Sequence, residues 1–462
     1  MGRNSQQRRA EKQRRSADRQ RAANARSFRT PSATSVPLTD DDMQAVVEEM
    51  ITLLCDMAYG AAANKADFTR CIDALHTREV QPSPIERPSA VVTRRLQKVI
   101  DNLLEFGWQP ADLVHTVKRE WTLRASRMVV AFIANHSRRH GAATRAPHAW
   151  LTQLEDMGVF DPVDGVVRGG VGDVLASWAR AERQHPEESL TTAVQILAQL
   201  RSAPHVSVLI DPPNAWGATN VGLTDRPRTG EVDEKALRLI RAMLAKAEAT
   251  DFEAEAESFT TKAQELMTRH SIDAAMMASA NKGSAHAAGI ESRRVHIDNP
   301  YGEEKSAFLS SVASVNGVRA VWGPACGFST LVGFPVDLGL TDVLFTSLLV
   351  QATHASAQAT TRDLNLRTAP FRRAFLIAFA ERITERLEAT QQHIAHDAQE
   401  TYGVALVPIL AERQAAVDAA FADAFPNTTV KRGRRLDAAG WYAGRAAAER
   451  ADIGIGEAIT GG

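Results

Sequence analysis

Apolar residues recur at three- and four-residue intervals through much of residues 38–210, and this is the period of an amphipathic helix. The stretch TDDDMQAVVEEMITLLCDMAYGAA opens with Thr39 and three aspartates, so it predicts a capped helix with acid at its positive end. SAVVTRRLQKVIDNLLEFG predicts a second amphipathic helix that ends before Gly107, and Pro110 marks the first turn of a third. Further helical periods occur in RMVVAFIANHSRR, HAWLTQLEDMG and SLTTAVQILAQL. Together these segments predict an all-α N-terminal domain over 38–210.

The periodic pattern resumes after DPPNAWGATNVGLTDRPRTG, a run rich in Pro, Gly, Asn and Thr that predicts a linker over 211–232. Two short amphipathic segments follow and predict a helical hairpin over 233–285, with ionic groups in solvent around one apolar seam. TDFE, between the two helices, fits a capping box with Thr250 as N-cap and Glu253 three residues later. The residues expected in the seam are Leu237, Leu239, Ile240, Met243, Leu244, Ala247, Phe252, Ala256, Phe259, Ala263, Leu266 and Met267. So small a hairpin buries too little surface to be stable alone, so we expect it to dock elsewhere on the chain.

Beyond residue 285 the pattern changes to short apolar runs. RRVHI, VRAVWG and STLVGF predict strands, and PACG predicts the turn between the last two. A helix is expected in KSAFLSSVASVN, and long Ala-rich helices in DVLFTSLLVQATHASAQATTRDL and FRRAFLIAFAERITERLEATQQHIAHDAQ. The order β-α-β-β-α-α predicts a small α+β domain with long helices over 286–462. The expected fold class is therefore mainly α, with three parts after the N-terminal arm.

The amino-acid composition indicates which class of protein this is. The chain has 462 residues, of which 44% are hydrophobic and 24% charged, as in ordinary globular proteins. No apolar run approaches the roughly 20 residues that span a bilayer, and an apolar secretory signal is missing, so we expect a cytoplasmic protein without a membrane partner. Cys55, Cys71 and Cys326 are few and widely spaced, which favours a reducing compartment and argues against a disulfide or a cysteine-bound zinc ion.

The net charge of −1 conceals a basic arm. Residues 1–30 carry ten Arg or Lys against Glu11 and Asp18, and an arm over 1–37 with so few large apolar residues is expected to be disordered. Such an arm either attracts DNA or RNA through counterion release or only keeps the protein soluble. A second basic cluster precedes Trp441, Tyr442 and Arg445, and a loop of this composition can hold phosphates and stack bases, or be a solvated charged loop. The candidate nucleic-acid-binding residues are Arg8, Arg9, Arg14, Arg15, Lys431, Arg432, Arg434 and Arg435.

Common catalytic fingerprints do not occur: H-E-x-x-H, G-x-x-x-x-G-K-[ST], G-x-S-x-G and G-x-G-x-x-G are all missing. His136 and His140 have the spacing of two zinc ligands, but no third ligand is evident, so a solvated basic surface is favoured. The same interpretation applies to His393, His396 and Asp397. We expect His270 to cap the end of a helix and Cys326 to be a packed, unreactive thiol. No catalytic residue, metal or cofactor is therefore assigned.

LRLIRAMLAKAEATDFEAEAESFTTKAQELMTRHSID resembles the helical module of the family of unknown function DUF2786, which occurs in bacterial and phage proteins. The matching positions include Ala247, Ala256, Ala263 and Met267. The polar matching positions, whose role is unknown, are Lys246, Thr250, Glu255, Lys262, Gln264 and His270. GFPVDL, LLVQA, FRRAFLIAFAERITERL and YAGRAAAERADIG are similar to the companion C-terminal domain, and GWQPADLVHTVKRE resembles an N-terminal region of some long members. The resemblance implies no activity, cofactor or catalytic residue.

Two function classes remain. The first is a non-enzymatic binding or adaptor protein whose basic segments contact nucleic acid or an acidic protein surface. The second is a hydrolase with a site between the hairpin and the α+β domain. Its candidate residues would be Asp337, His354, Glu255 and Lys262, which are polar and near expected packing surfaces. A protein-binding scaffold is a further form of the first class.

Overall fold

The computed structural model describes most of the predicted elements. The described residues are 39–59, 65–80, 84–160, 162–163, 166–167, 173–217, 234–249, 262–263, 265–275, 289–362, 367–402, 406–428 and 437–450. The chain forms two compact units, residues 1–91 and 92–462, and each is described by itself. Within the described residues the fold is mainly helical with one three-stranded sheet, which confirms the predicted fold class. The predicted domain boundaries stay predictions.

The first unit contains the helices α2 (Asp40–Tyr59) and α3 (Lys65–Val80) and the start of α4 (Pro88–Glu105). The predicted cap is present, because the backbone N–H of Asp42 donates to Thr39 Oγ1 at 3.2 Å. The backbone N–H of Thr39 in turn donates to Asp42 Oδ2 at 3.0 Å. This reciprocal pair satisfies two helix-end donors, and the hydrogen bonds from Thr39 hold the pKa of Asp42 below its usual value.

The second unit begins with the rest of α4 and a group of short helices. These are α5 (Pro110–Glu120), α6 (Leu123–Arg139), α7 (Ala142–Arg145), α8 (His148–Asp156), α9 (Val174–Ala181) and α10 (Pro186–Arg201). The predicted apolar face of α4 is buried through Leu96, Ile100, Leu103 and Leu104. Gly107 follows with a φ of +92°, and a Cβ there would lie 2.4 Å from the Val206 carbonyl oxygen. This part also contains a two-stranded ribbon, β1 (Pro162–Val163) and β2 (Val166–Val167), that the helical period did not predict.

The aperiodic run predicted as a linker starts with residues that pack against these helices. Residues 213–215 form the short helix η1 (Pro213–Ala215), and Pro213 and Trp216 are buried. Trp216 meets Trp150 edge to face at a centroid distance of 5.3 Å. Arg145 donates to the carbonyl oxygens of Trp216 and Gly217, both at 2.9 Å. Residues 211–217 therefore belong to the helical group, and 218–232 lie outside the described residues.

The hairpin region is described for α11 (Glu234–Ala249) and for a helix over 265–275. Ile240, Leu244, Ala263 and Met267 are buried in one apolar core with the helices that follow, as predicted. Leu239 departs from the prediction, since it is 48% exposed. The predicted capping box at Thr250 and Glu253, and the seam residues Phe252, Ala256 and Phe259, lie outside the described residues.

The sheet consists of β3 (Glu291–His296), β4 (Arg319–Gly323) and β5 (Phe328–Gly333) in the antiparallel order β3-β5-β4. The predicted PACG turn joins β4 to β5, with register pairs from Arg319↔Val332 to Gly323↔Phe328. β5 is completely buried, and β3 and β4 form the two edges. Strand alternation directs Val295, Leu331 and Trp322 to one face, where they pack on the apolar core.

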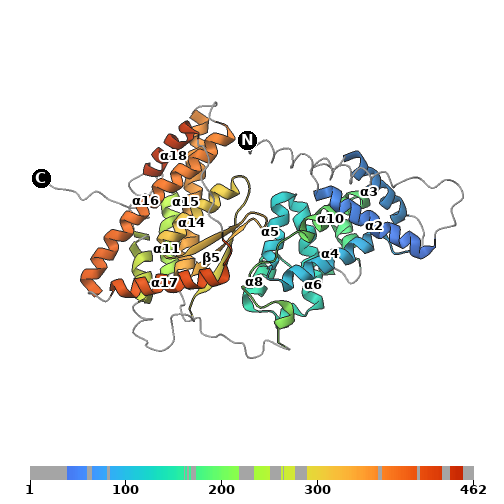
Figure 1. Cartoon of the computed structure of the whole chain (residues 1–462), viewed down its shortest axis with the longest axis horizontal. Helices are drawn as coiled ribbons and strands as arrows, with labels where there is room; N and C mark the ends of the chain where they lie inside the picture. The colour runs from blue at the N-terminus through green and yellow to red at the C-terminus, as the bar shows by residue number, and fades with distance from the viewer. Residues whose placement is uncertain are drawn as a thin grey trace, which may run out of the picture. The chain divides into compact units, whose positions relative to one another are not determined.

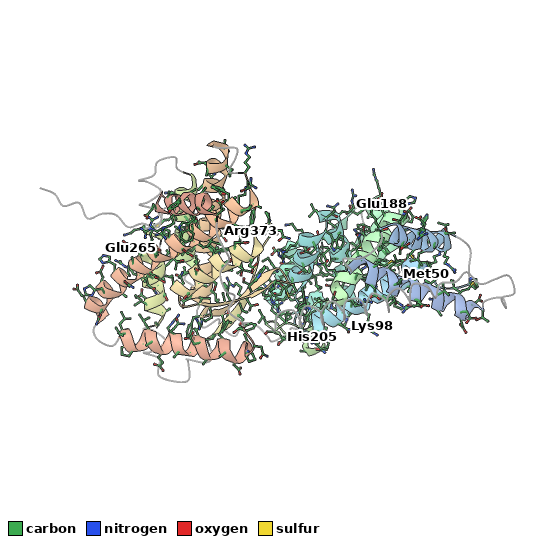
Figure 2. All side chains as sticks on the ribbon, turned by 45° about the horizontal axis from the view of Figure 1, so that its top comes forward. Met50, Lys98, Glu188, His205, Glu265 and Arg373 are labelled. Atoms are coloured by element: carbon green, nitrogen blue, oxygen red, sulfur yellow. The ribbon has the colours of Figure 1, made fainter. Side chains whose placement is uncertain are left out.

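Long helices form the rest of this core. They are α14 (Gly302–Val315), α15 (Pro335–Arg362), α16 (Ala369–Tyr402), α17 (Leu406–Ala424) and α18 (Ala438–Arg450). Figure 1 shows α14, α15, α16 and α18 close together. Phe308 of α14 contacts Phe345 of α15 and Phe379 of α16, both edge to face. Arg373 of α16, labelled in Figure 2, pairs with Glu304 of α14 at 3.4 Å.

The helix α15 differs from the expectation that no apolar run is long enough to span a bilayer. Pro335–Thr361 is long and apolar enough to span a membrane by length and composition, although no such run was expected. Of its most apolar window, 61% is buried inside the structure, and Leu338, Leu344 and Leu348 belong to the shared core. Burial in a protein core gives a helix the same apolar composition as a membrane segment.

Candidate functional site

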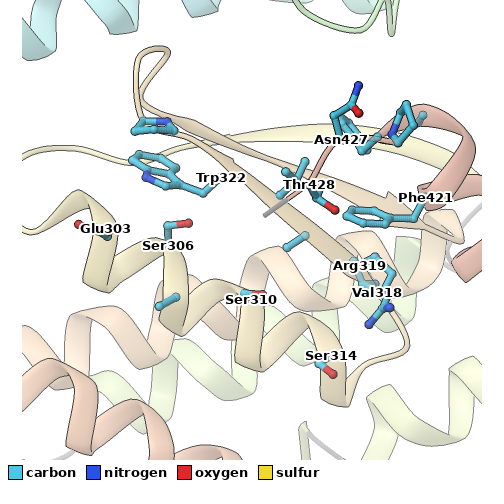
Figure 3. A pocket seen from close by; sticks show the side chains of 17 residues that line it. Glu303, Ser306, Ser310, Ser314, Val318, Arg319, Trp322, Phe421, Asn427 and Thr428 are labelled. Atoms are coloured by element: carbon cyan, nitrogen blue, oxygen red, sulfur yellow. The ribbon is translucent and has the colours of Figure 1, made fainter. Parts of the chain in front are cut away.

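A groove of about 860 Å³ runs between α14 and β4, and Figure 3 shows it from close by. One wall is the face of α14 that carries Ser306, Ser310 and Ser314 at one-turn spacing. The opposite wall is β4, including Arg319 and Trp322, and residues 421–428 border the groove at the end of α17. Its volume lies in the usual range of about 300–1,000 Å³ for ligand pockets.

Two local features of the sequence create this groove. β4 is an edge strand, so the peptide groups on its outer side have no partner strand within the described sheet. Beside it, α14 presents small side chains at a helical repeat, and Ala307, Ser310 and Ser314 are exposed. A helix face with larger side chains would fill the space next to the strand, whereas these leave it open.

The end of the groove next to α17 is built from aromatic and charged side chains. Phe421 and Phe425 lie with ring centroids 5.4 Å apart, and the guanidinium of Arg319 lies 5.7 Å from the Phe421 ring centroid. Arg319 also pairs with Asp418 at 2.9 Å and is about half exposed, so its charge is both compensated and solvated. On the floor, the Ser306 and Ser329 hydroxyls are 3.0 Å apart.

The lining is suited to binding more than to acid–base chemistry. Among the described lining residues, Glu303 and Arg319 carry charge, and none is a histidine or a cysteine. The serine hydroxyls therefore have no imidazole or thiolate beside them to act as a base or as a competing nucleophile. What the groove offers is the outer edge of β4, which has no partner strand in the described sheet, together with hydroxyl groups from α14 and apolar rings at one end.

The opposite face of the sheet carries a polar cluster centred on Asp112. Asp112 is 1% exposed, and its carboxylate accepts hydrogen bonds from the Arg294 guanidinium, from His296 Nε2 at 2.8 Å and from the Gln109 backbone N–H at 2.8 Å. Arg294 also donates to the Ser207 carbonyl at 2.7 Å and lies over the Phe328 ring at 4.8 Å. Because both carboxylate oxygens are engaged, the cluster holds α5 against β3 and leaves Asp112 no free oxygen for catalysis.

The next turns of α5 continue this contact. His115 stacks on His296 at 4.6 Å and its Nε2 lies 2.9 Å from the Gly327 carbonyl oxygen, while Thr116 donates to the Cys326 carbonyl at 2.7 Å. Burial lowers the pKa of His115, and nearby His296 lowers it further. Burial raises the pKa of the Cys326 thiol to about 11, and Asp112 adds to that shift. At neutral pH Cys326 is therefore a protonated, poorly nucleophilic thiol, in agreement with the prediction.

His136 and His140 differ from their prediction. His136 is 1% exposed and not part of a solvated surface, and its Nδ1 lies 2.8 Å from Asp101 Oδ1. His140 stacks on His136 at 4.2 Å, and burial lowers the pKa of His140. Asp101 lies on a different helix, α4, which is why sequence spacing did not identify it as a third member of the cluster.

Asp101 is held as a carboxylate by its neighbours. Arg139 donates to both of its oxygens, at 2.7 and 3.0 Å. Burial alone would raise the pKa of Asp101, but hydrogen bonds from His136 and Arg139 bring it down to about 2. Asp101 is therefore a negatively charged carboxylate beside two imidazole rings at neutral pH.

The described residues among the hydrolase candidates, Asp337, His354 and Lys262, are not brought together. Asp337 is buried and accepts hydrogen bonds from Ser271 Oγ at 2.7 Å and Arg413 at 2.6 Å, which is a structural clamp. His354 borders a different cavity, between α15 and β3, and Lys262 is exposed and pairs with Glu265 at 3.3 Å. Glu255 lies outside the described residues.

The other predicted positions divide into exposed and undescribed residues. His393 is 77% exposed and lies 3.8 Å from Asp397, which confirms the solvated interpretation. His270 does not end its helix, because the helix continues to residue 275, so the predicted capping role is wrong. Lys246 is exposed. Thr250 and Gln264 lie outside the described residues, as do all the candidate basic residues: Arg8, Arg9, Arg14, Arg15, Lys431, Arg432, Arg434 and Arg435.

The aromatic and cationic segment after residue 437 is a helix and not a loop. It forms α18, in which Gly440 and Gly444 pack against α16. Arg445 donates to both carboxylate oxygens of Glu385, at 3.1 and 3.2 Å. Its guanidinium is therefore already paired, whereas Tyr442 is 74% exposed. The alternative in which Arg445 takes part in a phosphate-holding loop therefore loses its basis.

The Asp112 cluster and the β4 groove were not predicted from the sequence. A signal for the first was present, since Asp112, His115, Thr116 and Arg119 fall on one helical face and Arg294 and His296 alternate on one strand face. Pairing the two faces requires contacts across more than 180 positions in the chain. For the groove, the serines of α14 were visible as a repeat of small residues, but the edge position of β4 depends on strand order.

Comparison with known proteins adds one finding. Residues 235–274 match the family model described as a protein of unknown function, DUF2786. No curated protein and no solved structure matches the chain. The match covers nearly all of α11 and the helical residues 265–274, which include the buried seam residues Ile240, Leu244 and Met267. This match agrees with the resemblance of residues 235–274 to the DUF2786 module.

Proposed function

We propose that this chain is a non-enzymatic binding protein that captures an extended peptide segment of another protein along β4. The observation that carries the proposal is the outer edge of β4, unpaired by any other strand among the described residues, beside a groove of about 860 Å³. An extended peptide can add to a free sheet edge, where main-chain hydrogen bonds supply affinity and alternate side chains supply specificity. The proposed partner is thus a peptide in β conformation.

The side chains of the groove define what the peptide presents. β4 has five residues, so an added strand of similar length would extend over roughly 16 Å. Residues that point toward α14 meet Ser306, Ser310 and Ser314, which favours small or hydroxyl-bearing side chains. An apolar residue at the α17 end would contact Phe421 and Phe425. The expected motif is a short, largely uncharged strand with a hydrophobic residue at one end.

The substitution Ser310→Trp is expected to abolish peptide capture, since an indole at this exposed position fills the groove while the buried side of α14 stays unchanged. The measurement is panning of the full-length protein against a random peptide display library, followed by titration of the selected synthetic peptides. We expect Ser310→Trp to weaken their binding by at least about a hundredfold, equivalent to about 2.7 kcal/mol.

The matched control is Gln392→Trp, an equally bulky change at an exposed position of α16 away from the groove. It should leave peptide affinity unchanged. Selection of no peptide by the full-length protein, or equal affinities for both tryptophan variants, would contradict the proposal. Circular dichroism of both variants distinguishes loss of binding from loss of fold.

A second binding activity, contact with nucleic acid, is favoured by the net charge of +8 in residues 1–30. Arginines in a basic arm neutralise phosphates and release counterions, so affinity falls as salt rises. Replacing Arg8, Arg9, Arg14 and Arg15 by Gln should lower affinity for a DNA or RNA oligonucleotide at low salt and reduce the slope of log K against log salt by about 3. The same change at Lys431, Arg432, Arg434 and Arg435 tests the second cluster separately. If the full-length protein binds neither DNA nor RNA at low salt, the arm serves only solubility.

We also propose that the DUF2786 module and residues 286–462, the companion domain, form one folded body. The shared core in which Ile240, Leu244 and Met267 pack with α14, α15 and α16 supports one body formed by the two segments. The bacterial or phage origin and a cytoplasmic location are proposed on the same resemblance and on the cysteine usage.

A further inference from the structure

We propose that Asp101, His136 and His140 form a binding site for a divalent transition-metal ion, with Zn²⁺ as the best-fitting ion. The three residues each offer one ligand atom, and these atoms lie within 4.8 Å of one another. The site is separate from the β4 groove and does not depend on the peptide-binding proposal.

Two helices position the ligands. His136 lies in the last turn of α6 and His140 is the C-cap residue that follows it, four positions later, so the two rings stack on the same side of the helix end. Asp101 reaches this face from α4, and its Oδ1 atom is 2.8 Å from His136 Nδ1. Zinc bonds to nitrogen and carboxylate oxygen are about 2.0–2.2 Å long, so small rotations of the stacked rings would bring the donors around one ion. No backbone movement is required for donors that already lie this close.

Burial provides independent support. His136 is 1% exposed, and its Nε2 atom is buried without a hydrogen-bond partner among the described residues. An unsatisfied ring nitrogen in the interior costs free energy. Coordination of the ion through Nε2, after a turn of the His136 ring, would relieve that deficit. Asp101 has 28% of its side chain exposed, which leaves a path for the ion and for a coordinating water.

The donor set selects the class of ion. Two imidazoles and one carboxylate suit zinc, copper and nickel, whereas calcium and magnesium prefer oxygen ligands alone. Three protein ligands leave a fourth tetrahedral position for water, as in open zinc sites. Glu105, one turn beyond Asp101 on α4, accepts hydrogen bonds from the Asn214 backbone N–H and is a second carboxylate near His136.

Arg139 is the competitor for this site. Its guanidinium binds both Asp101 oxygens, and metal binding must displace it from at least one of them. The Arg139 side chain is 42% exposed, so it can move into solvent. The three metal ligands therefore lie beside a cation, Arg139, that can leave when the metal ion binds.

The test is equilibrium dialysis of metal-stripped full-length protein against ZnCl₂ near neutral pH, with metal measured by mass spectrometry. We expect about one high-affinity zinc ion per chain and, with Co²⁺ in place of zinc, visible absorption bands of a tetrahedral site. His140→Gln and Asp101→Asn should each weaken zinc binding by at least about tenfold. Arg139→Gln should strengthen it by about fivefold, because a charge-assisted hydrogen bond no longer has to be broken.

His393→Gln is the matched control. It removes an exposed histidine that also lies four residues from an aspartate, so it should leave the stoichiometry and affinity unchanged. Zinc binding that is absent, or that Arg139→Gln and His140→Gln leave unaltered, would overturn the proposal. The opposite directions predicted for these two variants keep the test decisive even if Asp101→Asn fails to fold.

Discussion

Asp112→Ala is expected to destabilise the contact between α5 and the sheet by about 3–5 kcal/mol, which is the usual cost of removing one partner from a buried ion pair. The substitution leaves the Arg294 guanidinium, whose side chain is 3% exposed, without its carboxylate. It also removes the acceptor of His296 Nε2 and of the Gln109 backbone N–H. Native-state hydrogen exchange of the α5 and β5 amides measures the change, since it reports the local free energy of opening.

A paired replacement tests the cause of this loss. Asp112→Leu combined with Arg294→Met removes both buried charges, so most of the stability lost in Asp112→Ala should return. Arg445→Ala is the surface control, because its pair with Glu385 is partly exposed and should contribute less than about 1 kcal/mol. If Asp112→Ala behaves like Arg445→Ala, the Asp112 cluster does not hold α5 to the sheet.

Gly444→Ala is expected to destabilise the packing of α18 on α16 by about 1–3 kcal/mol, the usual range for overpacking. A Cβ at Gly444 would lie 2.3 Å from the Phe375 carbonyl oxygen and 3.0 Å from Ala378 Cβ, so the helices must separate. Gly440 shows the same approach, 2.3 Å from the Phe371 carbonyl oxygen. Helix propensity acts in the other direction by about 1 kcal/mol, and the close contact with backbone should outweigh it. Thermal unfolding followed by circular dichroism shows whether Gly444→Ala lowers or raises the stability of the protein.

The matched control for this prediction is Gly339→Ala on α15. A Cβ at Gly339 meets no atom within 4 Å, so only the propensity effect remains and the variant should be more stable by up to about 1 kcal/mol. Equal effects of alanine at positions 339 and 444 would show that α18 is not seated on α16 through its glycines.

The predicted elements follow from local physical chemistry. The period of apolar residues located α4, α5 and α6, and the three strand segments agree with β3, β4 and β5 within one or two residues. Thr39 and Gly107 mark helix ends because capping and a positive φ are properties of the residue itself. Leu239 was misplaced because a helical wheel cannot specify which part of an apolar arc meets the core and which part remains outside it.

The candidate sites were less accessible to sequence reasoning. Cys326 was correctly expected to be unreactive, since no basic residue is near it in sequence, and its burial by α5 gives the physical cause. His136 and His140 were recognised as a pair by spacing, but their burial and the approach of Asp101 depend on how α4 packs on α6. For Asp337, polarity suggested chemistry, and the contact with Arg413 instead makes it a structural residue.

The amino-acid sequence alone determined which segments are helical or extended, where several of them end, and that residues 235–274 resemble the DUF2786 module, because these depend on neighbours within a few turns. Tertiary structure decided the strand order that leaves β4 as an open edge, the pairing of Asp112 with Arg294 and His296, and the meeting of Asp101 with His136. These contacts join residues far apart in the chain, and many partners of similar polarity are equally compatible with the sequence. Burial and geometry select one set, since a buried charge or an open groove exists only when the elements have packed.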